Sequence, residues 1–362
     1  MHLDSAQSLK QQLMGSLVTP FATRADAVAR AGPRAITASA AVHSMLGAAA
    51  SFGIGAGPLE KTSGVHRSIA LGVAPHGRNE FRLAVRLQRS ALRNSDLVER
   101  IRKEAKGEVD LRIVGRIDKR ATAAASGVPW HQRKTDPMTM GASIGHWRVT
   151  AGTIGAFVRR AGTVYVLSNN HVLANEDRGA AGDAIVQPGT LDGGRRPADV
   201  VAKLRRWVRF KKSASNHVDV ALAALNAGIE YDATLLRAIA GKRHRHLVGL
   251  GPEFLDEGVV VYKVGRTTGA TKGRVTAFDL DNLVVRFDIG NLRFDNQIEI
   301  EGTGTRAFSD GGDSGSLIVD AEMRAVALLF AGSDTGGRND MGLTFAAPIH
   351  KVLSAVNATL LL

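Results

Sequence analysis

The sequence predicts a mostly β protein, in which a barrel or sandwich of short strands follows a small α/β module and an alanine-rich helical N-terminal segment. Beyond Gly141, short apolar runs recur at even spacing between turns rich in Gly and Asp, which is typical of an all-β barrel or sandwich. The 362 residues include 40 Gly, a content that suits many turns and close backbone approaches. Hydrophobic residues make up 44% of the chain, so it can bury a sizeable core.

Residues 1–63 form an alanine-rich lead segment. Alanine favours helix, and residues 5–14 are expected to form a short amphipathic helix. Gly53, Gly55 and Gly57 then interrupt the pattern. We expect part of this segment to be mobile or to pack on another subunit, which makes a homo-oligomer a candidate assembly.

Residues 64–118 have the pattern of a small α/β module. Strands are expected at 66–73, 80–87 and 109–114, and apolar and polar residues alternate along the last two. Asn94, Ser95 and Asp96 offer an N-cap for a short helix at 97–105. A module of this size must pack on something larger.

Residues 119–140 contain Pro129 and Pro137 and are interpreted as a linker. Residues 141–352 carry the short strands, with one helical insert expected at 231–240, and residues 353–362 are expected to form a C-terminal tail. The strands are expected at 155–159, 163–168, 200–208, 218–225, 258–264, 273–278, 283–288, 297–301, 316–319 and 325–331.

The formal net charge is +13, with basic runs at 205–206, 211–212 and 241–246. Such a charge attracts nucleic acid or anionic membranes, and it would also steer acidic protein substrates. No basic helix or nucleic-acid motif accompanies the runs, so solvated loops are the favoured interpretation and nucleic acid is an unlikely partner.

Two absences bear on the compartment. The chain has no Cys, so it has no disulfide and no thiolate for catalysis or metal binding, which points to a reducing compartment such as the cytoplasm. A thiol-free secreted bacterial protein would look the same. The first ten residues do not have the pattern of a secretory signal. No membrane span is expected, because the longest weakly polar stretch, 35–58, lacks sustained large apolar residues.

A serine in a glycine-rich turn is the candidate nucleophile. Ser314 is closely flanked by Gly312 and Gly315, which let the backbone bend sharply and expose Oγ. The same bend leaves the backbone N–H groups of Gly312 and Ser314 free to point at one spot, as an oxyanion hole requires. The alternative is an ordinary glycine-rich hairpin turn.

A base and an orienting acid complete this chemistry. A serine hydroxyl attacks a peptide carbonyl only if a base accepts its proton and a carboxylate holds that base in the right tautomer. His171 follows an expected strand at a turn and is the candidate base. Asp219 lies within the apolar run 218–225, where a buried carboxylate needs a partner such as an imidazole N–H. The alternatives are an ordinary surface or core histidine, and an aspartate that caps a turn.

The order His171, Asp219, Ser314 is that of chymotrypsin, and the three residues have separations similar to those of trypsin-like serine peptidases. More narrowly, the chain resembles bacterial trypsin-like peptidases related to the narrow-leaf protease of plants. This resemblance lies in residues 167–175, 263–269, 312–316 and 329–333 and covers about residues 64–352. It implies a chymotrypsin-like double β-barrel, with the triad in the cleft between barrels at about 141–230 and 255–352.

The resemblance also implies where a peptide substrate binds. The strand beside the bound peptide would be 329–333, and the primary pocket would be lined by Phe308, Phe330, Ala331 and Gly332. Phe308 stands at about the place of the pocket carboxylate of trypsin, which favours an apolar substrate side chain. Asp310 is interpreted as a turn residue. Phe330 replaces a serine that supports the buried aspartate in animal trypsins.

The sequence thus predicts a serine endopeptidase that acts on a protein or peptide substrate, with neither a cofactor nor a metal. His244 and His246 have no acidic or thiol companion that would make a metal site. A regulated intracellular protease is expected, because residues 1–118 add a module with no catalytic signature. The alternative is a protease fold that serves as a binding scaffold for protein or nucleic acid through its basic surface.

Overall fold

The computed structural model describes residues 1–18, 68–77, 79–119, 128–239, 244–253 and 258–362. The expected mobility of the lead segment and its glycines concerns residues 19–63, which lie outside the described residues. The chain divides into two compact units, Met1–Ile113 and Val114–Leu362.

In its described residues, the first unit combines three strands with two α-helices. The strands are β1 (Ile69–Gly77), β2 (Glu80–Leu87) and β3 (Val109–Ile113), with β1 antiparallel and β3 parallel to β2. Helix α1 (Leu3–Leu13) and helix α5 (Asp96–Glu104) contribute Leu13, Val98 and Ile101 to the core of this unit. The expected N-cap forms, since Ser95 Oγ accepts a hydrogen bond from the Val98 N–H at 3.4 Å.

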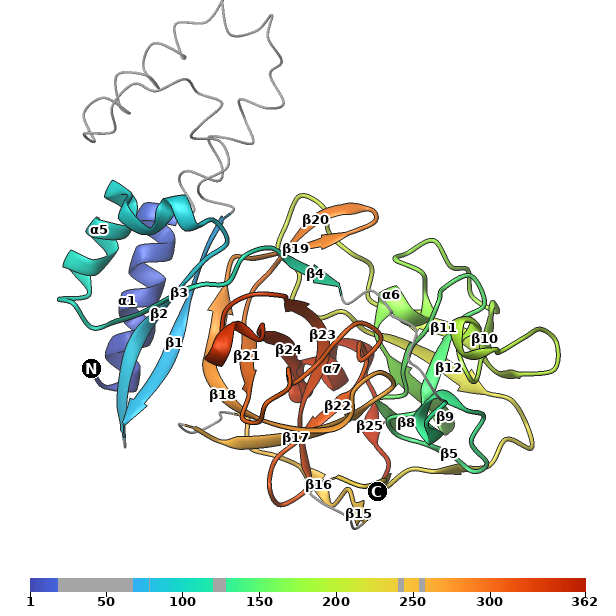
Figure 1. Cartoon of the computed structure of the whole chain (residues 1–362). Coiled ribbons are helices and arrows are strands. Elements are labelled where there is room, and N and C mark those ends of the chain that lie inside the picture. Colours follow the sequence, from blue (N-terminus) through green and yellow to red (C-terminus); the bar gives the residue numbers. More distant parts are fainter. Residues whose placement is uncertain (19–67, 78, 120–127, 240–243, 254–257) are drawn as a thin grey trace, which may run out of the picture. The chain divides into compact units, whose positions relative to one another are not determined.

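The second unit contains a closed barrel, drawn mostly in orange and red in Figure 1. Each strand of the ring pairs antiparallel with the next, and the last pairs with the first. In ring order they are β17 (Val260–Gly265), β18 (Gly269–Asp281), β21 (Gln297–Gly302), β24 (Thr344–Pro348), β23 (Arg324–Ser333) and β22 (Leu317–Val319).

A hairpin and a short strand extend this sheet. The hairpin consists of β19 (Leu283–Phe287) and β20 (Gly290–Phe294). Strand β4 (Ile117–Lys119) lies between β19 and β23 and pairs with both. Strand β16 (Gly249–Leu250) pairs with β23 elsewhere along its length.

The other large sheet is a half-barrel, whose central strands are green in Figure 1. Its interior is apolar, with Phe157, Ile185 and Leu222 fully buried. In sheet order its strands are β25 (Thr359–Leu360), β8 (Ala156–Arg160), β9 (Thr163–Ser168), β12 (Ala221–Leu225), β11 (Val200–Trp207), β10 (Ala184–Val186), β6 (Ser143–His146) and β7 (Gly152–Thr153).

Small elements complete the second unit. Residues 353–362, expected as a tail, finish helix α7 (Ile349–Val356) and form β25. Helix α6 (Asn170–Leu173) follows β9 directly. The remaining short strands pair as β5 (Met138–Thr139) with β13 (Tyr231–Asp232), and β14 (Leu235–Leu236) with β15 (Arg245–His246).

The predicted fold class is confirmed: the chain is mostly β, with two barrel-type sheets and an N-terminal helix. The helix expected at 231–240 is wrong, because β13 and β14 occupy its first part. The Asp232 carboxylate accepts hydrogen bonds from the N–H groups of Thr234 and Leu235, both at 3.0 Å, and this turn competes with a helix. Within the described ranges, no helix is long and apolar enough to cross a bilayer.

Candidate active site

His171 is presented by a short helix that is anchored in the core of the half-barrel. Strand β9 ends at Ser168, and α6 begins two residues later. Val172 and Leu173, the next two residues of α6, are buried in the hydrophobic core, so the helix cannot rotate without exposing them. The fold therefore fixes the direction of the His171 ring.

A buried carboxylate holds one side of that ring. His171 Nδ1 lies 2.5 Å from Asp219 Oδ2, and the His171 backbone N–H donates to Asp219 Oδ1 at 3.3 Å. Because an ionised carboxylate can only accept, Nδ1 carries the proton and Nε2 is the acceptor nitrogen. Asn169 Nδ2 donates to the Asp219 carbonyl at 2.7 Å and fixes the backbone of the acid. The apolar run predicted that Asp219 lies inside a strand, but in the structure it lies just before β12.

The other ring nitrogen is left available. His171 Nε2 is buried and has no hydrogen-bond partner among the residues that the structure describes. The ring of Phe287 lies against the imidazole in a T-shaped contact, with centroids 5.8 Å apart. An unpaired acceptor in such surroundings is ready to take a proton from a group that approaches it.

Ser314 lies on a tight loop of the closed barrel, and two glycines permit that loop. Gly312 and Gly315 both have a φ of +92°, in the left-handed region that glycine favours. A Cβ at Gly315 would collide with the hydroxyl of Ser168 at the end of β9. The loop therefore lies directly against the strand that leads to His171.

Thr153 of β7 fastens this loop to the half-barrel. Its N–H donates to the Ser314 carbonyl at 2.8 Å, and its hydroxyl donates to the Gly312 carbonyl at 2.9 Å. Ser168 in turn donates to the Thr153 carbonyl at 2.7 Å. These bonds bring the Ser314 loop and the His171 segment together, although the two lie far apart in the sequence. Ser314 Oγ does not bond to His171 Nε2; it donates to the carbonyl of Phe330 over a long 3.4 Å.

The backbone amides of the loop divide into bonded and unbonded groups. The N–H groups of Asp313 and Gly315 donate to the carbonyls of Asp310 and Leu329. The N–H groups of Gly312 and Ser314 donate to no residue within the described part of the chain. Two free donors beside a serine hydroxyl suit a developing oxyanion.

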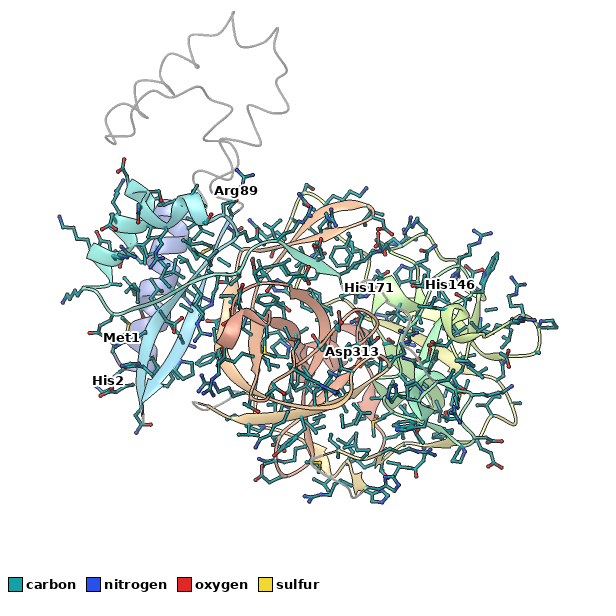
Figure 2. The ribbon with its side chains drawn as sticks, viewed as in Figure 1. Met1, His2, Arg89, His146, His171 and Asp313 are labelled. Atoms are coloured by element: carbon teal, nitrogen blue, oxygen red, sulfur yellow. The ribbon has the colours of Figure 1, made fainter. Side chains whose placement is uncertain are left out.

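A buried ion pair includes Asp313, the residue before Ser314. Lys263 Nζ lies 3.2 Å from the carboxylate of Asp313, and both side chains are fully buried; Figure 2 labels Asp313. Nζ also donates to Thr268 Oγ1 at 2.5 Å and to the Gly269 carbonyl at 3.2 Å, so it has three partners for its three protons. The ammonium group is therefore fully satisfied, which a buried charge requires.

The carboxylate of this pair is satisfied as well. It accepts the N–H groups of Asp310 at 3.0 Å and Thr267 at 2.8 Å, and the Thr268 hydroxyl at 2.7 Å. Burial alone would raise the pKa of Asp313, but the charge of Lys263 and these hydrogen bonds hold it below its ordinary value. Burial lowers the pKa of Lys263, and Asp313 opposes that change. The pair fixes the residue next to Ser314.

A cavity of about 540 Å³ opens beside Phe287. The residues predicted to bind substrate do not line it: Phe308, Phe330, Ala331 and Gly332 are all buried. Phe330 packs on Phe294 with centroids 4.7 Å apart, and the Phe308 ring lies below Lys263 Nζ. The cavity is lined instead by Phe287 and by charged residues: Asp118, Lys119, Arg286, Asp288, Asp310 and Asp334.

Several residues that build this site carry no strong signal in the sequence. Thr153, Lys263 and Phe287 each contact a predicted site residue or the loop that carries it. A lysine within the apolar run of β17 was the one available signal, because a buried ammonium needs an acidic partner. Asp310 is exposed, lines the cavity and accepts the Gly311 N–H at 2.6 Å, as a turn residue does. Across the described residues, no three His, Asp or Glu side chains gather as a metal site.

No family model matches the sequence, and no curated protein matches it. Among solved structures, the chain is similar to Thermobifida fusca protease A, at 17% identity and a TM-score of 0.44, over 62% of this chain and 99% of that one. It is also similar to Nocardiopsis protease, at 18% identity and a TM-score of 0.44, over 61% and 97%. Cellulomonas bogoriensis chymotrypsin shows 18% identity and a TM-score of 0.42, over 62% and 99%.

Proposed function

We propose that the protein is a serine endopeptidase in which His171, Asp219 and Ser314 form the catalytic triad. One observation carries this proposal: a buried imidazole is bonded to a buried carboxylate through Nδ1 and keeps Nε2 unpaired. This is the arrangement of a general base that a second group orients. The loop of Ser314 is fastened to the segment that carries this base, through Thr153 and Ser168.

The geometry supports acyl transfer through a covalent intermediate. Ser314 Oγ attacks the peptide carbonyl carbon while its proton passes to His171 Nε2, and the carbonyl oxygen becomes negative. The N–H groups of Gly312 and Ser314 stabilise that oxyanion. His171 then returns the proton to the leaving amine, the carbon–nitrogen bond breaks, and water hydrolyses the acyl-enzyme by the same steps. Asp219 keeps the Nδ1 proton in place and stabilises the imidazolium.

We further propose a regulated intracellular peptidase of the bacterial trypsin-like branch that resembles the narrow-leaf protease of plants. The absence of Cys supports a reducing compartment, such as the cytoplasm. The first unit, Met1–Ile113, contains none of the proposed catalytic residues and is available for regulation or for assembly of a homo-oligomer.

Replacing the nucleophile tests the central claim. We expect Ser314→Ala to lower hydrolysis of a peptide library by roughly 10⁴-fold or more and to abolish labelling by a fluorophosphonate. Mass spectrometry of the products would report activity and side-chain preference together. Ser354→Ala, at an exposed position of α7, is the matched control and should behave as wild type. A Ser314→Ala protein that still cleaves, or a wild type that fluorophosphonate does not label, would contradict the proposal.

A further inference from the structure

Two segments pair in succession along one edge of β23. The first is the loop of Ser314 and the second is strand β4. At Leu328, β24 and β22 pair with opposite edges of β23. On the edge of β22, the next residue, Leu329, exchanges backbone hydrogen bonds with Gly315 and Ser316 at 2.9 and 3.0 Å. The loop of Ser314 therefore continues the line of β22 along this edge.

Strand β4 occupies the last part of that edge. It pairs antiparallel with β23, with Lys119 opposite Ala331, Asp118 opposite Gly332 and Ile117 opposite Ser333. Because β24 pairs with the other edge at Ala331 and Gly332, β4 lies on the edge of the nucleophile loop. Its carboxyl end points along β23 toward Phe330, whose carbonyl accepts the bond from Ser314 Oγ.

This edge and this direction suit a peptide substrate. An extended peptide binds a sheet by adding a strand to an open edge, where main-chain hydrogen bonds supply affinity. A peptide that lies along 331–333 with its carboxyl end toward Phe330 brings its next residues toward Ser314, whose Oγ bonds to the Phe330 carbonyl. The backbone of β4 already fills that position, so β4 and a substrate compete for it.

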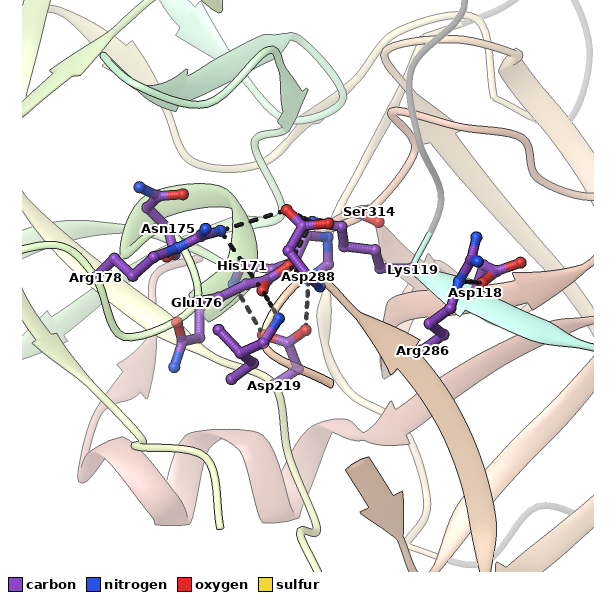
Figure 3. A network of polar contacts seen from close by, with 12 residues as sticks. Asp118, Lys119, His171, Asn175, Glu176, Arg178, Asp219, Arg286, Asp288 and Ser314 are labelled. Carbon is purple, nitrogen blue, oxygen red and sulfur yellow. Dashed lines mark hydrogen bonds and ion pairs between the residues drawn. The ribbon is translucent and has the colours of Figure 1, made fainter. Parts of the chain in front are cut away.

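Acidic side chains hold the end of β4. Lys119 Nζ forms ion pairs with Glu176 and, at 2.7 Å, with Asp288 (Figure 3). The pKa of Asp288 is lowered, mainly by the hydrogen bond from Lys119. The positive charge of Lys119 and the contact with Arg178 lower it further. Glu176 is almost fully buried and also accepts the N–H groups of Asp288 at 3.2 Å and Ile289 at 3.0 Å. A buried carboxylate fixed in this way is built to receive a cation.

Asp118, the residue before Lys119 in β4, is held more loosely. Asp118 accepts a hydrogen bond from Arg286 Nε at 2.7 Å, and Arg286 is half exposed. Both residues line the 540 Å³ cavity, so this part of β4 borders solvent. Exposed ion pairs contribute little stability, and a strand of three residues buries few backbone bonds. Displacement of β4 by a competing peptide is therefore feasible.

We propose that the edge of β23 at 331–333, with Glu176 and Asp288, is a strand-addition site for extended peptides that carry Lys or Arg at the place of Lys119. Strand β4 is the resting occupant of this site and must leave before a substrate binds. This inference rests on the proposed peptidase function. It adds a preference for a basic substrate side chain at the position of Lys119, and it adds inhibition of the enzyme by its own strand β4.

Kinetics of the full chain test the competition. With fluorescein-labelled casein as substrate, Lys119→Ala should lower KM about 3- to 10-fold and leave kcat unchanged, because it weakens only the occupant. Lys119→Arg keeps the cation and should match wild type. Lys134→Ala, which removes another lysine from an ion pair with Asp199, is the matched control. An unchanged or higher KM for Lys119→Ala would overturn the proposal.

Binding tests the site without any need for activity. In full-length Ser314→Ala protein, a fluorescein-labelled peptide with the sequence of residues 114–119 should bind about tenfold more tightly when Lys119→Ala is added. The same peptide carrying Lys119→Glu should bind at least tenfold more weakly, because it places a carboxylate against Glu176 and Asp288. Equal affinity of the two peptides would overturn the basic preference.

Hydrogen exchange covers the case in which the Lys119 variants do not fold. In the Ser314→Ala protein, saturation with the unlabelled 114–119 peptide should speed amide exchange of β4. Binding of the peptide with unchanged exchange would overturn the competition. Fluorophosphonate labelling separates the two claims: a labelled enzyme without these effects refutes the strand-addition site alone. If the peptide displaces β4 in the Ser314→Ala protein but fluorophosphonate does not label the wild type, the peptidase function alone is refuted.

Discussion

The half-barrel and the closed barrel each supply part of the candidate site, but they hold their residues by different forces. In the half-barrel, the core residues of α6 and short hydrogen bonds position His171 and Asp219. In the closed barrel, a fully buried ion pair between Lys263 and Asp313 fixes the loop of Ser314. The two regions meet through hydrogen bonds of Thr153.

The difference suggests that the two halves fail in different ways. Within the described residues, Asp219 bonds to the imidazole and forms no ion pair with a lysine or arginine, so a neutral isostere keeps its packing. Lys263 neutralises a carboxylate that has no access to water, so its loss leaves a buried charge. We therefore expect the half-barrel to lose chemistry before stability, and the closed barrel to lose stability first.

The largest expected effect is on catalysis, at Asp219. In Asp219→Asn, the amide can donate to His171 Nδ1, which moves the ring proton to Nε2 and removes the base. We expect kcat to fall roughly 10⁴-fold, about 5 kcal/mol of barrier, with little change in the thermal midpoint of unfolding. Steady-state kinetics and calorimetry would measure both, with Asp199→Asn as the matched control. A loss of less than tenfold in kcat would contradict the role of Asp219.

The next effect is on stability, at Lys263. Lys263→Met keeps much of the side-chain volume but leaves Asp313 buried and unpaired. We expect the free energy of unfolding to fall by about 3–5 kcal/mol, measured by urea denaturation. Lys272→Met, at an exposed position of β18, should change it by less than about 0.5 kcal/mol.

A double-mutant cycle sharpens this test. Because Lys263→Met and Asp313→Asn remove the same interaction, the double variant should lose less stability than the sum of the two single losses. Strict additivity would show that the ion pair does not hold the loop.

The smallest expected effect is on the pH dependence of stability, at His146 of the half-barrel. His146 of β6 donates from Nε2 to Asp183 at 3.0 Å, and its Nδ1 accepts the Arg148 N–H at 3.1 Å, so the native ring is neutral. Burial lowers the pKa of His146, although Asp183 opposes the change. In the unfolded chain His146 therefore takes up a proton near pH 6.5, while in the folded chain it does so only at a lower pH. Stability should fall as the pH drops below 6.5, by at most about 1.4 kcal/mol per pH unit for this group.

The contribution of Asp313 lies in a lower window. The pKa of its carboxyl is held below 3.8, so its stabilisation is present at neutral pH and is lost only as the pH falls through that lowered value.

Urea denaturation at several pH values between 7 and 5 tests the role of His146. The free energy of unfolding should change less with pH for His146→Gln than for wild type. The exposed His76→Gln serves as control. An unchanged slope for His146→Gln would refute the assignment of this window to the half-barrel.

Local patterns in the sequence determined much of the fold. The alternation of residues 80–87 predicted β2 with its exact bounds, and the residues before 97 predicted the N-cap of α5. These signals succeed because side-chain period and capping act within a few residues. The glycines around Ser314 likewise marked a loop that only glycine permits, with positive φ at Gly312 and Gly315. The helix expected at 231–240 failed because one Asp side chain stabilised a turn there.

Only the tertiary structure decided several other contacts between distant residues. Lys263 and Asp313 are 50 positions apart, and Lys119 lies opposite Ala331 although more than two hundred residues separate them. Strand β4 was interpreted as the end of a module and the start of a linker, because three residues carry no period that reveals a partner. The energy of such contacts depends on burial and on the register of neighbouring strands, which are properties of the folded chain and not of any local run of residues.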